Sequence, residues 1–350
     1  MNLQYQHRFF LSILVLLPIL FCSILVNSFY SSHQENKYVD NTKYLKKEIK
    51  KIKQTEPDIV LMGNSMLEEG IDVSLLNKYL NAKFHKFAIP GSASASWYLM
   101  LKNIIIAAEP SPQTVVLFFR DPFITHAKYR TSGKYEKNIL KFASPNEPLV
   151  AELVYGDMSQ KTLGKLPIYG YKNKISEDVT TAIKEISATS LGLNVKQLDK
   201  TLKTSFAAEK TRQTEVTKAQ EVAESYTAFS PDEFDFQKKL SQSFLPAIVA
   251  LAQENEINLI LVRVRKRDAA KGKELPANVV NYIKAMDNYL EKEDITLLDY
   301  TLLADLQEEH YADGDHLNEK GELIFTKSLG YDIAEILDLK IKKKKKKKKK

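Results

Sequence analysis

The sequence predicts an α/β fold of the doubly wound class, in which helices cover both faces of a parallel sheet. Short runs rich in valine, isoleucine and leucine alternate along the chain with segments of helical pattern. The runs are apolar throughout rather than alternating with polar residues, which is typical of strands buried on both faces. A length of 350 residues permits one large domain or two small ones, and the alternation of strands and helices favours one α/β domain with additions.

Five runs are predicted as strands, at residues 58–63, 83–91, 114–119, 258–264 and 295–300. Helical patterns follow at 67–80, at 92–109 and at 318–337. One further helix is expected over 231–254, because Ser230 suits the N-cap and Pro231 the first helical position. In open sheets of this class the working site lies beyond the carboxyl ends of the strands.

The alternation stops between the third and fourth strands. Residues 125–229 are predicted as an insertion that is mostly helical, charged and rich in tyrosine. Because it follows the third strand, it starts at the edge where a site is expected. Two interpretations are open: a lid or substrate-binding subdomain, and a peripheral decoration.

The N-terminal segment 1–32 predicts a single-pass membrane anchor. Residues 9–32 carry no charge, and 18 residues of helix span roughly 27 Å, close to the apolar thickness of a bilayer. A cleaved signal peptide is the alternative, although no small-x-small cleavage site follows cleanly. The polar, lysine-rich residues 33–56 are predicted as a partly helical stalk, and 57–337 as the α/β domain.

The basic balance of the chain comes from its last residues. Lys342 to Lys350 are nine consecutive lysines, more than the net charge of +7, so the rest of the chain is slightly acidic. The composition is therefore no argument for nucleic-acid binding. Residues 338–350 are expected to be a disordered tail, either solvated or held electrostatically at an anionic surface. A single cysteine, Cys22, excludes an intrachain disulfide.

Ser65 follows the first predicted strand directly, in Gly63-Asn64-Ser65. A serine needs a base to act as a nucleophile, and His126, His310 and His316 are the histidines that could approach the strand ends. His316 is the best placed, because Asp313 precedes it by three residues and could orient its ring. The simpler interpretations are a helix N-cap for Ser65 and an Asx-turn or metal site for Asp313 and Asp315. Leu317 excludes an EF-hand.

These residues resemble the motifs of the SGNH/GDSL hydrolase superfamily. Gly63-Asn64-Ser65 resembles its Gly-Asp-Ser block, and Asp313-Gly314-Asp315-His316 its Asp-x-x-His block. The resemblance covers roughly 57–124 and 231–337, and implies a three-layer, flavodoxin-like fold. It also implies that Ser65 is the nucleophile, His316 the base and Asp313 its partner, with no metal or dissociable cofactor. Gly91 would supply an oxyanion-hole N–H, beside that of Ser65 or Met66.

Two departures from the family pattern concern the residues that would bind substrate. Asn64 stands where aspartate is commonest. The third block, usually Gly-x-Asn-Asp, is replaced by Arg120-Asp121, so a side-chain oxyanion donor worth ~3 kcal/mol is missing unless Arg120 substitutes for it. Arg265, after the fourth strand, is a candidate for binding an anionic polymer, and the simpler interpretation there is a solvated loop with Arg263 paired to a carboxylate.

The combination of a membrane anchor with these departures resembles the layout of the membrane-bound SGNH-like proteins that work beside membrane-bound O-acyltransferases. This resemblance implies an extracytoplasmic O-acyltransferase or esterase acting on a cell-surface glycan or polyol, with the bilayer and a membrane O-acyltransferase as partners. The alternative is a non-catalytic scaffold protein of glycan assembly that keeps the fold. The residues alone do not separate transferase from esterase, because both use the same acyl-enzyme.

Overall fold

The structure is a computed structural model, which describes residues 41–120, 122–144, 147–155, 185, 197, 231–267 and 275–342. The chain separates into two compact units, Met1–Tyr38 with Tyr155–Thr214, and Val39–Val154 with Glu215–Lys350. Almost all of the first unit lies outside the described residues. The second unit contains the predicted α/β domain.

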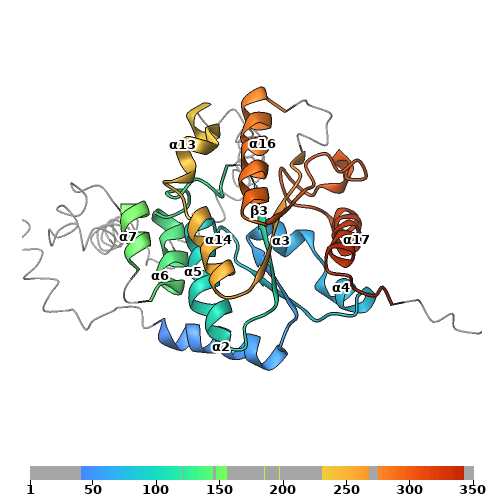
Figure 1. The fold of residues 1–350 in the computed structure, drawn as a ribbon, viewed down its shortest axis with the longest axis horizontal. Coiled ribbons are helices and arrows are strands. Elements are labelled where there is room, and N and C mark those ends of the chain that lie inside the picture. Colours follow the sequence, from blue (N-terminus) through green and yellow to red (C-terminus); the bar gives the residue numbers. More distant parts are fainter. Residues whose placement is uncertain are drawn as a thin grey trace, which may run out of the picture. The chain divides into compact units, whose positions relative to one another are not determined.

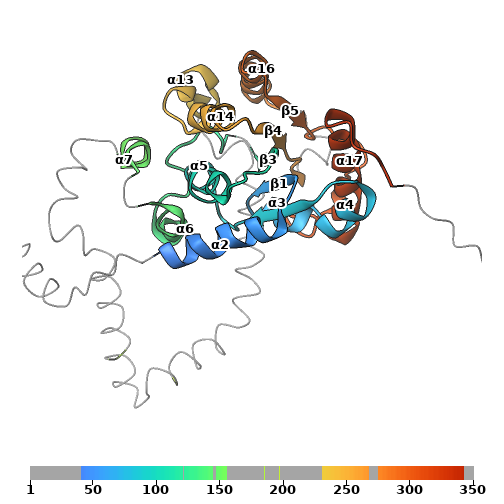
Figure 2. The ribbon, with the colours of Figure 1, turned by 60° about the horizontal axis from the view of Figure 1, so that its bottom comes forward.

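A single five-stranded parallel sheet organises this unit, with strand order β2-β1-β3-β4-β5 (Figures 1 and 2). The predicted α/β class with five parallel strands is therefore confirmed. The order reverses between β1 and β3, which is the switch point where doubly wound folds place their sites. The strands are β1 (Ile59–Gly63), β2 (Phe84–Ala88), β3 (Thr114–Phe119), β4 (Asn258–Arg263) and β5 (Thr296–Asp299).

Helices occupy the connections between the strands. The α-helices are α2 (Thr42–Thr55), α3 (Ser65–Gly70), α4 (Val73–Tyr79), α5 (Ser94–Met100), α6 (Glu136–Phe142), α7 (Pro148–Tyr155), α13 (Phe236–Leu240), α14 (Leu245–Glu254), α16 (Ala277–Lys292) and α17 (Glu319–Ile336). Shorter turns of other helix types are η1 (Leu101–Ile105), η2 (Ile106–Ala108), η3 (Gly133–Tyr135), η5 (Pro231–Phe234) and η6 (Glu308–His310).

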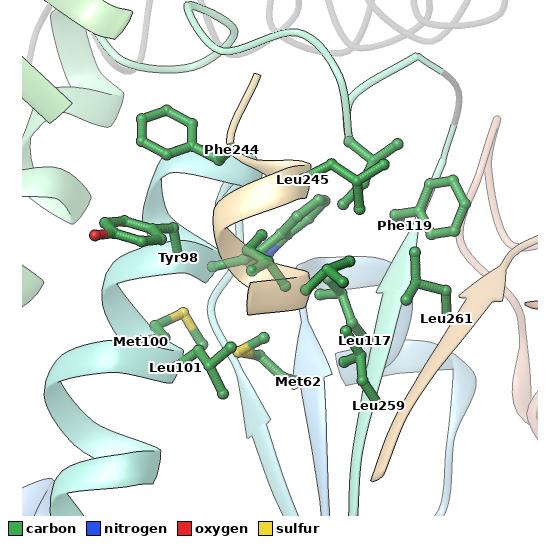
Figure 3. Close-up of a cluster of buried hydrophobic side chains, with 14 of the residues drawn as sticks. Met62, Tyr98, Met100, Leu101, Leu117, Phe119, Phe244, Leu245, Leu259 and Leu261 are labelled. Atoms are coloured by element: carbon green, nitrogen blue, oxygen red, sulfur yellow. The ribbon is translucent and has the colours of Figure 1, made fainter. Parts of the chain in front are cut away.

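The two faces of the sheet bury two separate apolar cores, because successive strand residues point to opposite faces. In β3, Leu117 belongs to the core beneath α5, α14 and α16, while Val116 belongs to the core beneath α3, α4 and α17. Figure 3 shows the first of these cores, which contains Leu117 and Leu261 of the strands and Leu245 of α14. This double burial explains why the strands are apolar throughout.

Polar side chains fix where the helices next to the strand ends begin. The Asn64 side chain accepts a hydrogen bond from the Met66 N–H at 3.0 Å and caps α3, and Asp72 caps α4 through the Leu75 N–H at 3.1 Å. Asn318 accepts from the N–H groups of Lys320 and Gly321, both at 3.1 Å, and caps α17. Such caps satisfy N–H groups that have no partner inside the helix.

Three of the predicted helices are broken in the structure. The segment 67–80 forms α3 and α4, and Asp72 caps the second of them. The segment 231–254 forms η5, α13 and α14 rather than one helix. Asp235 caps α13 within the segment. A further helix, α14, begins at Leu245 and has Pro246 in its first turn, where the missing N–H of proline costs no helical hydrogen bond. The predicted helix over 92–109 is α-helical only to Met100 and continues as the π-turn η1 and the 3-10 turn η2.

Parts of the expected stalk and insertion contribute to the α/β core. Residues 42–55 of the expected stalk form α2, and Ile52 of α2 is buried in the core that contains α5. From the expected insertion, Phe142 of α6 and Val150 of α7 join the same core. Within the insertion, residues 145–146, 156–184, 186–196 and 198–229 lie outside the described residues.

The two chain ends carry predictions that the described residues do not reach. In the described part of the chain, no helix is both long and apolar enough to cross a bilayer, and the expected anchor at 1–32 lies outside that part. At the other end, Ile341 forms a bridge with Leu80, and the Lys342 N–H donates to the Tyr79 carbonyl at 2.7 Å. The expected tail thus begins against the end of α4, and residues 343–350 lie outside the described range.

Candidate active site

Ser65 is the first residue of α3 and lies directly beyond the carboxyl end of β1. The N-cap is Asn64, not Ser65, so the interpretation of Ser65 as a capping residue is wrong. Its hydroxyl is free of the helix end and is available for another partner. Ser65 is half-buried, whereas Asn64 before it and Met66 after it are buried.

His316 lies in the loop between η6 and α17, which two backbone contacts close. Tyr311 and Leu317 form an antiparallel bridge, and the Ala312 N–H donates to the His316 carbonyl at 2.8 Å. At the start of α17, Gly321 passes so close to the loop that a Cβ there would lie 2.3 Å from the His310 carbonyl oxygen. Glycine at 321 therefore lets the loop pack on the helix and places His316 at a fixed position.

The structure brings Ser65, His316 and Asp313 together in one hydrogen-bonded chain. His316 Nε2 lies 2.9 Å from Ser65 Oγ, and His316 Nδ1 lies 3.0 and 2.9 Å from the two carboxylate oxygens of Asp313. A carboxylate only accepts hydrogen bonds, so the ring proton is placed on Nδ1. The lone pair of Nε2 then faces the serine hydroxyl, which is the arrangement a general base requires.

Asp313 is itself held by the backbone of the loop. Its Oδ1 accepts hydrogen bonds from the N–H groups of Asp315 at 3.1 Å and of His316 at 3.0 Å. The Asx-turn interpretation of Asp313 is therefore correct, and it is compatible with the orienting role. The turn aims the carboxylate at the imidazole ring, which lies three residues along the chain.

Glu69 is a second carboxylate beside His316, which the sequence analysis missed. Its Oε2 lies 3.9 Å from His316 Nδ1, and its side chain is 49% exposed. Glu69 follows Ser65 by four residues on the same helix, so both side chains lie on one face of α3. The spacing to Ser65 could have identified it, once a helix was expected to start at Ser65.

The loop after β2 lies beside Ser65 and contains Gly91. The Ile89 N–H donates to the Gly63 carbonyl at 2.9 Å, and Ser92 Oγ donates to the same carbonyl at 3.1 Å. Trp97 Nε1 donates in turn to Ser92 Oγ at 2.9 Å, and this network is buried. These bonds attach the 89–92 loop to Gly63, the last residue of β1, which precedes Ser65 by two residues.

Gly91 has a backbone conformation that favours glycine, with φ of 76°. The Tyr135 ring covers it, so that a Cβ at position 91 would lie 2.7 Å from Tyr135 Cε1. Both requirements explain the glycine in "FAIPGSAS". Neither depends on the chemistry proposed for the site.

The structure distinguishes between the backbone N–H groups of Ser65, Met66 and Gly91, which were the three candidate donors to an oxyanion. The Met66 N–H donates to the Asn64 side chain, so the alternative that Met66 supplies the second donor is wrong. Among the described residues, the structure gives no acceptor for the N–H groups of Ser65 and Gly91. These two N–H groups remain available to a substrate oxygen.

Arg120, at the end of β3, is committed to a structural contact. Its guanidinium pairs with the Asp315 carboxylate and lies 4.7 Å from the Phe123 ring centroid. The Arg120 side chain is 7% exposed. Arg120 therefore links the sheet to the His316 loop through Asp315, which directly precedes His316.

The other residues suggested for substrate binding also have structural contacts. Asn64 caps α3, and Arg265 Nη1 donates to the Leu303 carbonyl while burial lowers the pKa of the Arg265 guanidinium. The interpretation of Arg263 as paired is correct, because its Nη1 contacts both Asp299 oxygens, at 3.0 and 2.9 Å. That pair links β4 to β5.

The remaining candidate histidines are held away from Ser65 by other partners. His310 Nδ1 accepts from the Gln307 N–H at 2.9 Å and caps η6. His126 lies 3.6 Å from Glu233 and stacks on Tyr129. In the described ranges there is no group of three or more histidine, cysteine or acidic residues arranged to hold a metal ion.

Comparisons with known proteins return similarities of fold at low sequence identity. No protein-family model matches the sequence, and no curated protein matches it. The chain is similar to a GDSL-like lipase of Bacteroides thetaiotaomicron, with 14% identity over 86% of this chain and 100% of that one, and a TM-score of 0.39. It is also similar to a Bacteroides fragilis protein described as an acylhydrolase, with 13% identity over 80% and 87% of the two chains and a TM-score of 0.38. The chemistry of this site therefore has to be argued from its own residues.

Proposed function

We propose that the protein is a serine-dependent acyl-transfer enzyme, an O-acyltransferase or esterase that works through an acyl-serine intermediate. The observation that carries the proposal is the hydrogen-bonded chain from Ser65 Oγ through His316 to Asp313, at 2.9 to 3.0 Å in each contact. A nucleophile, a base and a group that orients the base are thus in contact before any substrate binds.

The reaction begins when Ser65 Oγ attacks the carbonyl carbon of an ester. His316 Nε2 takes the hydroxyl proton, and the negative charge of Asp313 stabilises the imidazolium that forms. The carbonyl oxygen becomes an oxyanion, which the free N–H groups of Ser65 and Gly91 can bind. One such donor is typically worth ~3 kcal/mol of transition-state stabilisation.

The tetrahedral intermediate collapses when the bond to the alcohol breaks. His316 returns its proton to the departing alcohol oxygen, and the acyl group stays on Ser65 as an ester. An incoming hydroxyl then gives its proton to His316 and attacks the acyl-serine. Water as the acceptor gives an esterase, and a sugar or polyol hydroxyl gives an O-acyltransferase.

Labelling with a fluorophosphonate probe tests this proposal, because the probe forms a covalent bond only with an activated serine. We expect labelling of the wild-type chain and its loss in Ser65→Ala. Ser74→Ala is the matched control, because Ser74 is an exposed serine in the next helix, α4, and should leave labelling intact. A well-folded wild-type chain that takes no label would contradict the proposal and favour the alternative of a non-catalytic scaffold.

The acceptor and the location belong to the same proposal. The apolar segment 1–32 supports a single-pass anchor that holds the catalytic domain outside the cytoplasm, where cell-surface glycans and polyols are the available acceptors. A membrane-bound O-acyltransferase would supply the acyl group. Membrane fractionation of the full chain and of a chain lacking residues 1–40 tests the anchor, since equal recovery of both in the soluble fraction would overturn it.

A further inference from the structure

Arg130 is a half-buried cation in the segment that joins β3 to α6 (Figure 1), and three aromatic rings lie within 6 Å of its guanidinium carbon. Its guanidinium carbon lies 5.1 Å from the ring centroid of Tyr135, 5.2 Å from that of Tyr129 and 5.8 Å from that of Phe123. Its backbone φ is 54°, which is uncommon for a residue other than glycine. The chain therefore accepts backbone strain at the position that presents this guanidinium.

Two ring contacts place Arg130 next to the proposed active site. The Tyr135 ring that Arg130 contacts also covers Gly91, the proposed oxyanion-hole glycine. The Phe123 ring also contacts both Arg130 and Arg120, whose guanidinium carbons lie 5.8 and 4.7 Å from its centroid. Arg120 pairs with Asp315, the neighbour of His316. Arg130 is thus one aromatic ring away from the oxyanion-hole loop and one from the partner of the histidine loop.

A second cation shares the Tyr135 ring. Lys134 Nζ lies 5.1 Å from the ring centroid. Within the part of the chain that the structure describes, neither Arg130 nor Lys134 forms an ion pair with a carboxylate. Two like charges near one ring repel each other, and an anion that binds close to both relieves the repulsion.

We propose that Arg130, supported by Lys134, binds an oxyanion group on the substrate of Ser65. A planar guanidinium held by aromatic rings presents a fixed fork of N–H donors, which suits two oxygens of a phosphate or a carboxylate. The inference rests on the proposed function, and it narrows the substrate to an ester or acceptor that carries a negative charge close to the reacting hydroxyl. A phosphorylated polyol and an acidic sugar are the two sources of such a charge.

Binding to the full-length Ser65→Ala chain tests the inference, because this variant cannot turn the ester over. The probes are acetylglycerol phosphate, an O-acetyl hydroxy acid and neutral acetylglycerol, titrated calorimetrically. We expect one or both anionic esters to bind roughly tenfold more tightly than the neutral ester, and Arg130→Gln to remove most of that preference. A preference for the phosphate alone assigns a phosphorylated polyol, and one for the carboxylate alone assigns an acidic sugar.

Two further variants separate binding from folding. Arg130→Lys keeps the charge but not the fork of donors, so it should recover only part of the preference. Lys128→Gln, which removes an exposed lysine two residues earlier, should leave it unchanged. Equal affinities for charged and neutral esters, or a preference that survives Arg130→Gln, would overturn the inference.

The result is separable from that of the proposed function. If Ser65 takes the fluorophosphonate label but charge has no effect on binding, the acyl-transfer proposal stands and the anion subsite is rejected. If Ser65 takes no label but the preference for anionic esters depends on Arg130, the subsite stands and the chemistry is rejected.

Discussion

Ser65 Oγ and His316 Nε2 lie 2.9 Å apart, although 251 positions separate the two residues in the chain. The first residue follows β1, an inner strand of the sheet, and the second is fixed by the packing of its loop on α17. The contact is therefore a property of the whole sheet and its last helix. Folding alone therefore places the proton acceptor of the proposed reaction, His316 Nε2, beside the serine hydroxyl.

Loss of His316 or of its partner Asp313 should reduce turnover to a similar extent. We expect His316→Ala and Asp313→Asn each to lower kcat on an activated aryl ester by about 10⁴-fold, because the asparagine amide can donate to Nδ1 and would favour the wrong tautomer. Steady-state kinetics with unfolding curves for each variant provide the measurement. Asp305→Asn, an exposed acid in the loop before η6, is the control and should keep full activity.

Glu69 should contribute a smaller, salt-dependent share of the activity. Its carboxylate lies 3.9 Å from His316 Nδ1 but is half exposed, so solvent screens its attraction for the imidazolium. We expect Glu69→Gln to lower kcat roughly two- to fivefold at low ionic strength and less in high salt. Glu68→Gln is the matched control, since the neighbouring exposed acid has no contact with His316 among the described residues. A change independent of salt would contradict an electrostatic role.

Gly91 should be intolerant of any side chain. Alanine at φ of 76° is strained, and its Cβ would meet Tyr135 at 2.7 Å. We expect Gly91→Ala to cost about 1–3 kcal/mol of unfolding free energy, and to lower kcat by roughly 10²-fold because the displaced N–H no longer meets the oxyanion.

Gly133→Ala separates the loss of stability expected for Gly91→Ala from the loss of kcat. Gly133 has a similar φ of 59°, but no atom lies within 4 Å of an added Cβ. It should therefore lose stability from backbone strain, with a much smaller change in kcat. Equal losses of kcat in both variants would contradict a specific role for Gly91.

The strands, and the three residues of the hydrogen-bonded chain, could be predicted from the sequence because the patterns that indicate them are local. Apolar runs mark strands buried on both faces, and Asp313 and His316 lie three residues apart. Their meeting with Ser65 followed from the topology of the class, in which the carboxyl ends of the strands share one edge.

Contacts between distant segments could not be predicted in the same way. Arg120 was a candidate donor to the substrate, and only the folded chain shows that Asp315 occupies its guanidinium. The choice between the N–H groups of Ser65 and Met66 depended on the side chain of Asn64, which can cap the helix or face a substrate. Arg130 lies in a segment without a regular apolar period, so no pattern indicated which residues surround it.

His126 should make the stability of the fold depend on pH in the mildly acidic range. Burial lowers the pKa of His126, while the Glu233 carboxylate at 3.6 Å acts to raise it and Lys239 acts to lower it. As the pH falls below the ordinary histidine value of about 6.5, the unfolded chain takes up a proton that the folded chain resists. The unfolded state then binds more protons, so the free energy of unfolding decreases as the pH falls. Denaturant unfolding at pH 7.5 and pH 5 should show this decrease, and His126→Asn should reduce it.

In His126→Asn, the loss of stability between pH 7.5 and pH 5 should become smaller without disappearing. Burial also lowers the pKa of His85 in β2, and this second histidine destabilises the fold in acid in the same way. Replacing both histidines should therefore flatten the dependence further than either change alone. If His126→Asn shifted the free energy of unfolding equally at both pH values, the substitution would be acting through packing against Tyr129 and not through the proton. A wild-type chain more stable at pH 5 than at pH 7.5 would require other groups, with the opposite sign, to outweigh these two histidines.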